Sequence, residues 1–157
     1  MSSGRRPAPP AARAALQCAE EAHLFEKLFR KKSAPLTGAP PVRRQKTYSA
    51  QSGYVYQYYY EGHRPFRREG EAGAEFVFDV SADRKTSGPV SVFVNDEAVR
   101  SWEQKHGRAL AATELYATAK MALFQAFDER AHPGLMKQDI GVRAADMEAI
   151  LEGLGID

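Results

Sequence analysis

The sequence predicts an α+β fold, a small three-stranded antiparallel sheet with C-terminal helices packed on one face, preceded by a flexible arm that contains one helix. Three observations lead to this prediction. Apolar residues alternate with others in the middle of the chain, they recur at helical spacing in its last third, and proline and arginine are frequent at its beginning. With 157 residues, the chain suits one domain of ordinary size.

The N-terminal arm, residues 1–50, differs from the rest of the chain in charge. It holds ten lysines and arginines against three acidic residues, a net charge of +7, whereas residues 51–157 carry −5. Residues 1–10 lack core-forming side chains, and we expect them to be disordered. The alanine-rich stretch over about 11–32 predicts a helix, and the prolines that follow it, over residues 33–53, predict a linker. We therefore place the globular domain at residues 51–157.

The domain should begin with strands and end with helices. Alternating apolar residues predict strands over residues 54–60, 75–80 and 89–95, and the connections between them are too short for a crossover helix. Antiparallel pairing is therefore expected. Helical spacing then predicts helices over about 97–106, 113–131 and 144–153, with a cap at Thr113 for the second of them.

The first strand is unusual because a tyrosine occupies every second position. If this tyrosine face is open, its rings could stack on the bases of single-stranded RNA, and each such contact is worth about 1–3 kcal/mol. If helices cover it, the rings belong to the core. Basic residues on both sides of the strand would suit phosphates. The residues of this alternative nucleic-acid site are Arg43, Arg44, Lys46, Tyr54, Tyr56, Tyr58, Tyr60, Arg64, Arg67 and Arg68.

The predicted arm helix offers a second kind of binding surface. It combines a narrow apolar stripe with a basic C-terminal end, so it could order on a protein partner that presents an acidic surface. It could equally fold back on the chain's own acidic domain. The residues that we predict to bind a partner are Phe25, Leu28, Phe29, Arg30, Lys31 and Lys32.

Motifs for catalysis, metal binding or nucleotide binding are absent from the sequence. There is no phosphate loop, dinucleotide-binding glycine pattern or nucleophile elbow, and the four histidines lack metal-ligand spacing. The single cysteine, Cys18, indicates a reducing compartment. We therefore expect no catalytic residues, no metal and no cofactor. An enzyme would require His63 or His106 to meet a carboxylate at a strand end.

A polar loop at residues 81–89 is either functional or a solvated hairpin end. No apolar run reaches the roughly 20 residues that span a membrane, and we expect a cytoplasmic protein. Together, these features predict a small non-catalytic binding or accessory protein that joins a larger assembly through its basic arm. The alternative is single-stranded RNA binding through the tyrosine face and a basic loop.

Overall fold

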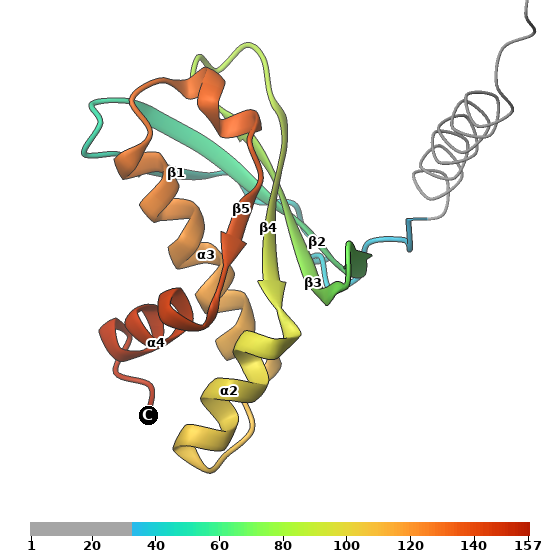
Figure 1. The fold of residues 1–157 in the computed structure, drawn as a ribbon. Helices are drawn as coiled ribbons and strands as arrows, with labels where there is room; N and C mark the ends of the chain where they lie inside the picture. Colours follow the sequence, from blue (N-terminus) through green and yellow to red (C-terminus); the bar gives the residue numbers. More distant parts are fainter. Residues whose placement is uncertain (1–32) are drawn as a thin grey trace, which may run out of the picture. The chain divides into compact units, whose positions relative to one another are not determined.

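The computed structural model describes residues 33–157 (Figure 1). Four strands of a five-stranded sheet come first, three helices separate them from the fifth strand, and one helix follows it. The residues from Pro35 onward form one compact unit. The elements are β1 (Lys46–Ser49), β2 (Val55–Arg68), β3 (Glu71–Ser81), β4 (Gly88–Asn95), α2 (Asp96–His106), α3 (Ala112–Glu129), the 3₁₀ helix η1 (Pro133–Lys137), β5 (Ile140–Val142) and α4 (Ala144–Gly153).

The strand order is β1-β2-β3-β4-β5, and the sheet is mixed. The first four strands pair antiparallel, whereas β5 runs parallel to β4. The predicted α+β class with C-terminal helices is therefore confirmed, and the three predicted strands pair antiparallel as β2, β3 and β4. The prediction of a three-stranded, wholly antiparallel sheet is wrong, because it lacks β1 and β5. β1 has four residues and lies in the stretch predicted as a linker, and β5 has three. Strands this short carry no alternation that a sequence pattern could reveal.

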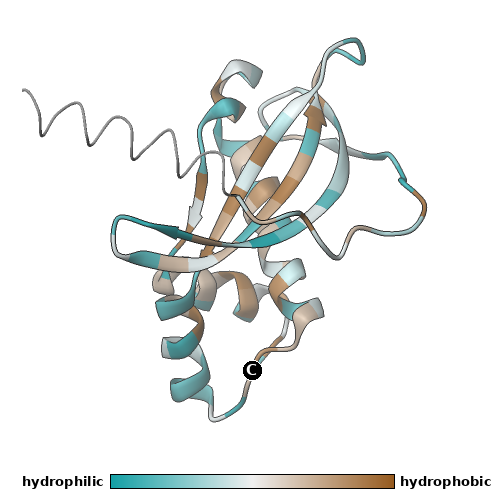
Figure 2. Cartoon of the chain, turned by 90° about the vertical axis from the view of Figure 1, so that its right-hand side faces the viewer, coloured by the Kyte–Doolittle hydropathy of each residue, from teal (hydrophilic) through white to brown (hydrophobic). Residues whose placement is uncertain are grey.

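One face of the sheet is covered by the helices and contains the hydrophobic core. Tyr56 stacks on Phe127 of α3 with 4.1 Å between ring centroids, and Tyr48 stacks on Phe124 at 4.2 Å. Side chains of α2 and α4, including Trp102 and Met147, belong to the same core. Hydrophobic residues follow the strands in Figure 2, while the hairpin ends are mainly hydrophilic. We call the helix-covered side of the sheet the inner face and the opposite side the outer face.

The helix ends follow from local hydrogen bonds. Asn95 caps α2 by accepting a hydrogen bond from the backbone N–H of Glu97, and Gly107 ends that helix with a left-handed φ of 71°. α3 begins one residue earlier than predicted, at Ala112, where Glu114 accepts a hydrogen bond from the backbone N–H of Ala111. The predicted cap at Thr113 is therefore wrong.

A bulge in β2 brings the segment before β1 against the sheet. The pairing with β3 shifts between Tyr60 and Gly62, and His63 then forms an isolated bridge with Thr37. Gly62 has a φ of 120°, and an added Cβ would lie 2.6 Å from the Thr37 carbonyl oxygen, so only glycine suits this position. The chain after this bridge, residues 38–45, leads into β1. No helix among the described residues is long and apolar enough to cross a membrane.

Candidate binding site

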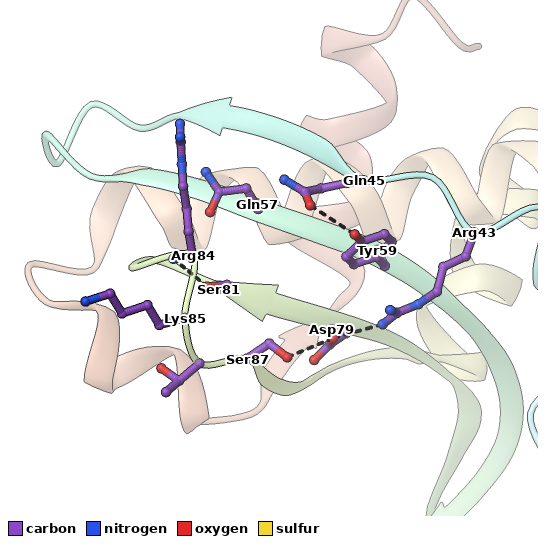
Figure 3. Close-up of a pocket in the computed structure, with 10 residues that line it drawn as sticks. Arg43, Gln45, Gln57, Tyr59, Asp79, Ser81, Arg84, Lys85 and Ser87 are labelled. Carbon is purple, nitrogen blue, oxygen red and sulfur yellow. Dashed lines mark hydrogen bonds and ion pairs between the residues drawn. The ribbon is translucent and has the colours of Figure 1, made fainter.

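A polar hollow lies on the outer face of the sheet, beside the hairpin between β3 and β4 (Figure 3). We call it the polar groove, and its volume is about 380 Å³. Strands β2 and β3 form its floor, and its two walls come from the segment before β1 and from the hairpin. The floor consists of Gln57, Tyr59, Asp79 and Ser81, and the walls consist of Arg43, Gln45 and residues 84–87.

The first wall is held to the floor by Arg43. Its guanidinium donates hydrogen bonds to Asp79 at 2.9 Å and to Glu61 at 2.9 Å, and it lies 3.9 Å from the centroid of the Tyr59 ring. The Tyr59 hydroxyl donates to the carboxamide oxygen of Gln45 at 2.9 Å. The charge of Arg43 is therefore already balanced by carboxylates.

The second wall is ordered by Asp83 at the turn of the hairpin. Its carboxylate accepts hydrogen bonds from the backbone N–H groups of Thr86 and Lys85 and from the Thr86 hydroxyl, each at 2.8 Å. These bonds, with the Thr86 backbone contributing most, hold the pKa of Asp83 well below its usual range. Ser87 donates to Asp79 at 3.0 Å, which ties the end of the hairpin to the floor.

Two cations on this wall are not balanced. Arg84 and Lys85 are exposed and line the polar groove. Among the described residues, neither has an acidic group within ion-pair distance. Figure 3 shows Arg84 extending along the edge of the polar groove beside Gln57. The hairpin, residues 81–89, therefore keeps a net charge of +1, because Asp83 offsets only one of these two cations.

Two neighbouring residues of β2 bury a polar atom that has no hydrogen-bond partner in the described part of the chain. They are Tyr56, through its hydroxyl oxygen, and Gln57, through its carboxamide oxygen. Their side chains are 0% and 5% exposed. Leaving such an atom unpaired costs about 1–3 kcal/mol, so buried polar atoms are nearly always paired in folded proteins.

The two unpaired atoms lie on opposite faces of the sheet. Gln57 belongs to the floor of the polar groove, whereas Tyr56 lines a second, more apolar hollow of about 690 Å³ on the other side of the hairpin. Val80, Val90 and Met136 also line this second hollow. Both buried side-chain oxygens that lack a hydrogen-bond partner in the described chain therefore belong to residues that line hollows beside the β3–β4 hairpin.

The predicted tyrosine face is the inner face. Tyr56 and Tyr58 are 0% and 3% exposed and pack against α3, so their rings are not open to a base in this structure. Tyr54 and Tyr60 are half-buried against the same core. The alternation predicted for these four tyrosines agrees with the structure, in which helices cover the face that they share.

Two of the basic residues of the predicted nucleic-acid site, besides Arg43, are already paired with acidic side chains. Arg64 pairs with Glu75 at 2.7 Å, and Arg68 pairs with Asp139 at 3.3 Å. Arg44, Lys46 and Arg67 are exposed. Of the ten residues in that prediction, only Arg43 lines the polar groove. The partner-binding residues that we predicted in the arm, from Phe25 to Lys32, lie outside the described residues.

The histidines that an enzyme would need are in separate places. His63 contacts the Tyr60 hydroxyl at 3.0 Å, and His106 contacts Glu148 at 3.0 Å. Among residues 33–157, no group of three or more histidine, cysteine or acidic side chains could hold a metal ion. The polar loop at residues 81–89 was singled out from the sequence, but Gln45, Gln57 and Tyr59 were not. The signal for Gln57 was weak, since it is one polar residue in a run of aromatic ones.

Comparison of the chain with protein-family models, with curated proteins and with solved structures gives no match. The candidate site therefore rests on the geometry around the hairpin.

Proposed function

We propose that the protein is a non-catalytic binding protein, a component of a larger assembly that holds a protein partner with its basic arm and with the polar groove. The observation that carries this proposal is the carboxamide oxygen of Gln57, which is buried and unpaired at the floor of the groove. A turn of this side chain toward the groove would let a partner donate a hydrogen bond to the oxygen and remove the cost of leaving it unpaired.

The rigidity of the polar groove supports a binding role. Its floor lies on two paired strands, and its hairpin wall is fixed by the hydrogen bonds of Asp83. Groups that are already in place lose little freedom when a partner binds, so more of the contact energy remains as affinity. The volume of about 380 Å³ also falls within the range of roughly 300–1,000 Å³ that is usual for ligand sites.

The charge distribution indicates what kind of partner would bind. The arm segment, residues 1–50, has a net charge of +7, and the hairpin wall adds Arg84 and Lys85, which form no ion pair among the described residues. A partner with an acidic surface would complement both. Single-stranded RNA binding is the weaker proposal, because the tyrosines that were expected to stack on bases pack against α3.

Affinity capture from native lysate with full-length variants tests this proposal. One variant removes the hairpin charges (Arg84→Gln with Lys85→Gln), and a second removes arm charges (R30Q, K31Q and K32Q). The matched control removes two exposed charges elsewhere, Arg100→Gln with Arg143→Gln. Each capture is made with and without nuclease.

We expect wild type and control to recover the same protein, and both charge variants to lose it, whether or not nuclease is present. Recovery that survives both variants would contradict the proposal. Recovery that disappears with nuclease would support the nucleic-acid alternative instead. Loss by the arm variant alone would leave the arm as the binding element and remove the polar groove from the function.

A further inference from the structure

The hydrogen-bonding groups of the polar groove that remain free are mainly donors. Arg84 and Lys85 lack acidic partners among the described residues, and the carboxamide oxygen of Gln45 is already used by Tyr59, which leaves its amide N–H₂. One oxygen of the Asp79 carboxylate, Oδ2, already accepts from both Arg43 and Ser87. A ligand that fits the groove should therefore carry negatively charged acceptors.

The carboxamide oxygen of Gln57 is the exception, because it is an acceptor that needs a donor. It is buried at the floor, on the same strand as Tyr59 and beside the hairpin wall that carries Arg84. A ligand must therefore offer an N–H or O–H group a short distance from its negative charge. A polypeptide with acidic side chains has both groups, since each residue supplies a backbone N–H beside its carboxylate.

We infer that the polar groove binds an acidic peptide segment of the partner. The carboxamide of Gln57 turns toward the groove and accepts a hydrogen bond from a backbone N–H of the segment, whose carboxylates accept from Arg84 and Lys85 on the hairpin wall. This inference rests on the proposed function and adds the chemical nature of the bound segment. It also explains why a protein would keep a buried glutamine on the outer face of a strand that is otherwise aromatic.

The structure favours a peptide over a nucleic acid at this place. Arg43 lies over the ring of Tyr59, so that face of the ring is not available for a base. Asp79 and Asp83 are part of the groove or adjoin it, and residues 51–157 carry a net charge of −5, which would repel a continuous phosphate backbone. A segment with a few carboxylates avoids much of this repulsion.

Residue-resolved NMR on the ¹⁵N-labelled full-length protein tests the inference, because it separates peptide in the groove from peptide on the basic arm. The probe is hexaglutamate with blocked ends, and hexaglutamine, inorganic phosphate and oligouridylate are the comparison ligands. We expect hexaglutamate alone to shift the side-chain amide signals of Gln45 and Gln57 and the Arg84 side-chain signal in a saturable way. Shifts confined to other residues would overturn the inference, as would equal shifts with phosphate or oligouridylate.

Two neighbouring substitutions in β2 provide a matched pair. Gln57→Met removes the unpaired oxygen of the outer face, and Tyr56→Phe removes the unpaired oxygen of the inner face. We expect Q57M to weaken hexaglutamate binding in the groove about fivefold, the value of one hydrogen bond. We expect Y56F to leave it unchanged. Replacing Arg84 and Lys85 by glutamine should weaken it about tenfold or more, because these bonds are charge-assisted.

Thermal unfolding of the two variants without peptide distinguishes a binding residue from a structural one. Because Gln57→Met removes a buried oxygen without a partner, its unfolding temperature should equal or exceed that of the wild type. A clear fall would show that the glutamine is satisfied within the fold, for instance by an internal water, and would overturn the inference. If hexaglutamate fails to bind while partner capture still depends on the hairpin charges, the inference is wrong and the proposed function stands.

Discussion

Replacing Phe127 tests whether α3 covers the tyrosine face. Phe127 is 0% exposed, and its ring lies 4.1 Å from that of Tyr56, 5.8 Å from that of Tyr48 and 6.3 Å from that of Tyr58. Truncating a buried phenylalanine to alanine costs about 3–5 kcal/mol, since the cavity adds to the lost transfer energy. A small domain has a stability of about 5–15 kcal/mol. Phe127→Ala should therefore remove a large part of the stability.

Urea unfolding, followed by the fluorescence of the single tryptophan and by far-ultraviolet circular dichroism, measures this loss. Phe127→Leu keeps much of the volume but not the ring stacking, and should cost about 1 kcal/mol. Phe93→Ala on the outer face, where the side chain is half-buried, is the comparison. If F127A loses no more stability than F93A, α3 does not seal the tyrosine face, and the argument against base stacking fails with it.

Three further predictions concern single positions. Gly73→Ala should lower the free energy of unfolding by about 1–3 kcal/mol, because an added Cβ would lie 2.1 Å from a backbone oxygen of β4. Gly88→Ala is the control, since a Cβ there meets nothing within 4 Å and should be tolerated. Thermal unfolding compares the two variants. A hydrogen-bonded arginine and a backbone N–H lower the pKa of Glu114 to about 2. The ionised Glu114 carboxylate stabilises the fold fully above its ordinary pKa of 4.5, and this stabilisation is lost as the pH falls toward 2. The unfolding temperature of E114Q should therefore depend less on pH between 4.5 and 2 than that of the wild type. Burial raises the pKa of Tyr58 and Tyr60 from 10.0 to about 12. Tyrosinate absorbance should therefore show both hydroxyls still neutral in the folded protein at a pH where tyrosines of the unfolded chain are ionised. Because ionisation favours the unfolded chain, the free energy of unfolding should fall as the pH rises through 10 toward 12. A stability that is independent of pH in these two windows would contradict the last two predictions.

Sequence patterns predicted the elements that have enough length to show a period. Residues 54–60 alternate over the first half of β2, although the strand continues to Arg68 through a stretch predicted as a connection. α3 repeats its apolar residues over several turns. β1 and β5 are too short for this, and they form because pairing and burial in the folded chain stabilise them. Tyr48 in β1 stacks on α3, and Ile140 and Val142 of β5 are buried beside β4. Such contacts connect distant parts of the chain and leave no local signal.

The candidate site could be predicted only in fragments. The hairpin at residues 81–89 was recognised from its polar composition, and alternation placed Gln57 on the face opposite to the tyrosines. Neither observation shows that the amide is buried, unpaired and next to two unbalanced cations. That combination depends on the bulge in β2 and on the segment that packs before β1, and therefore on tertiary structure.

The parallel pairing of β4 with β5 has a consequence for how the chain is made. Val92 pairs with Ile140, so α2, α3 and η1 must all be synthesised before the free edge of β4 receives its neighbour. During translation this valine-rich strand therefore waits longer for its second neighbour than the other two inner strands, β2 and β3, do. Exposed edges of this kind template association between nascent chains. The late arrival of the three residues of β5 thus sets how long this edge of β4 stays open to such association.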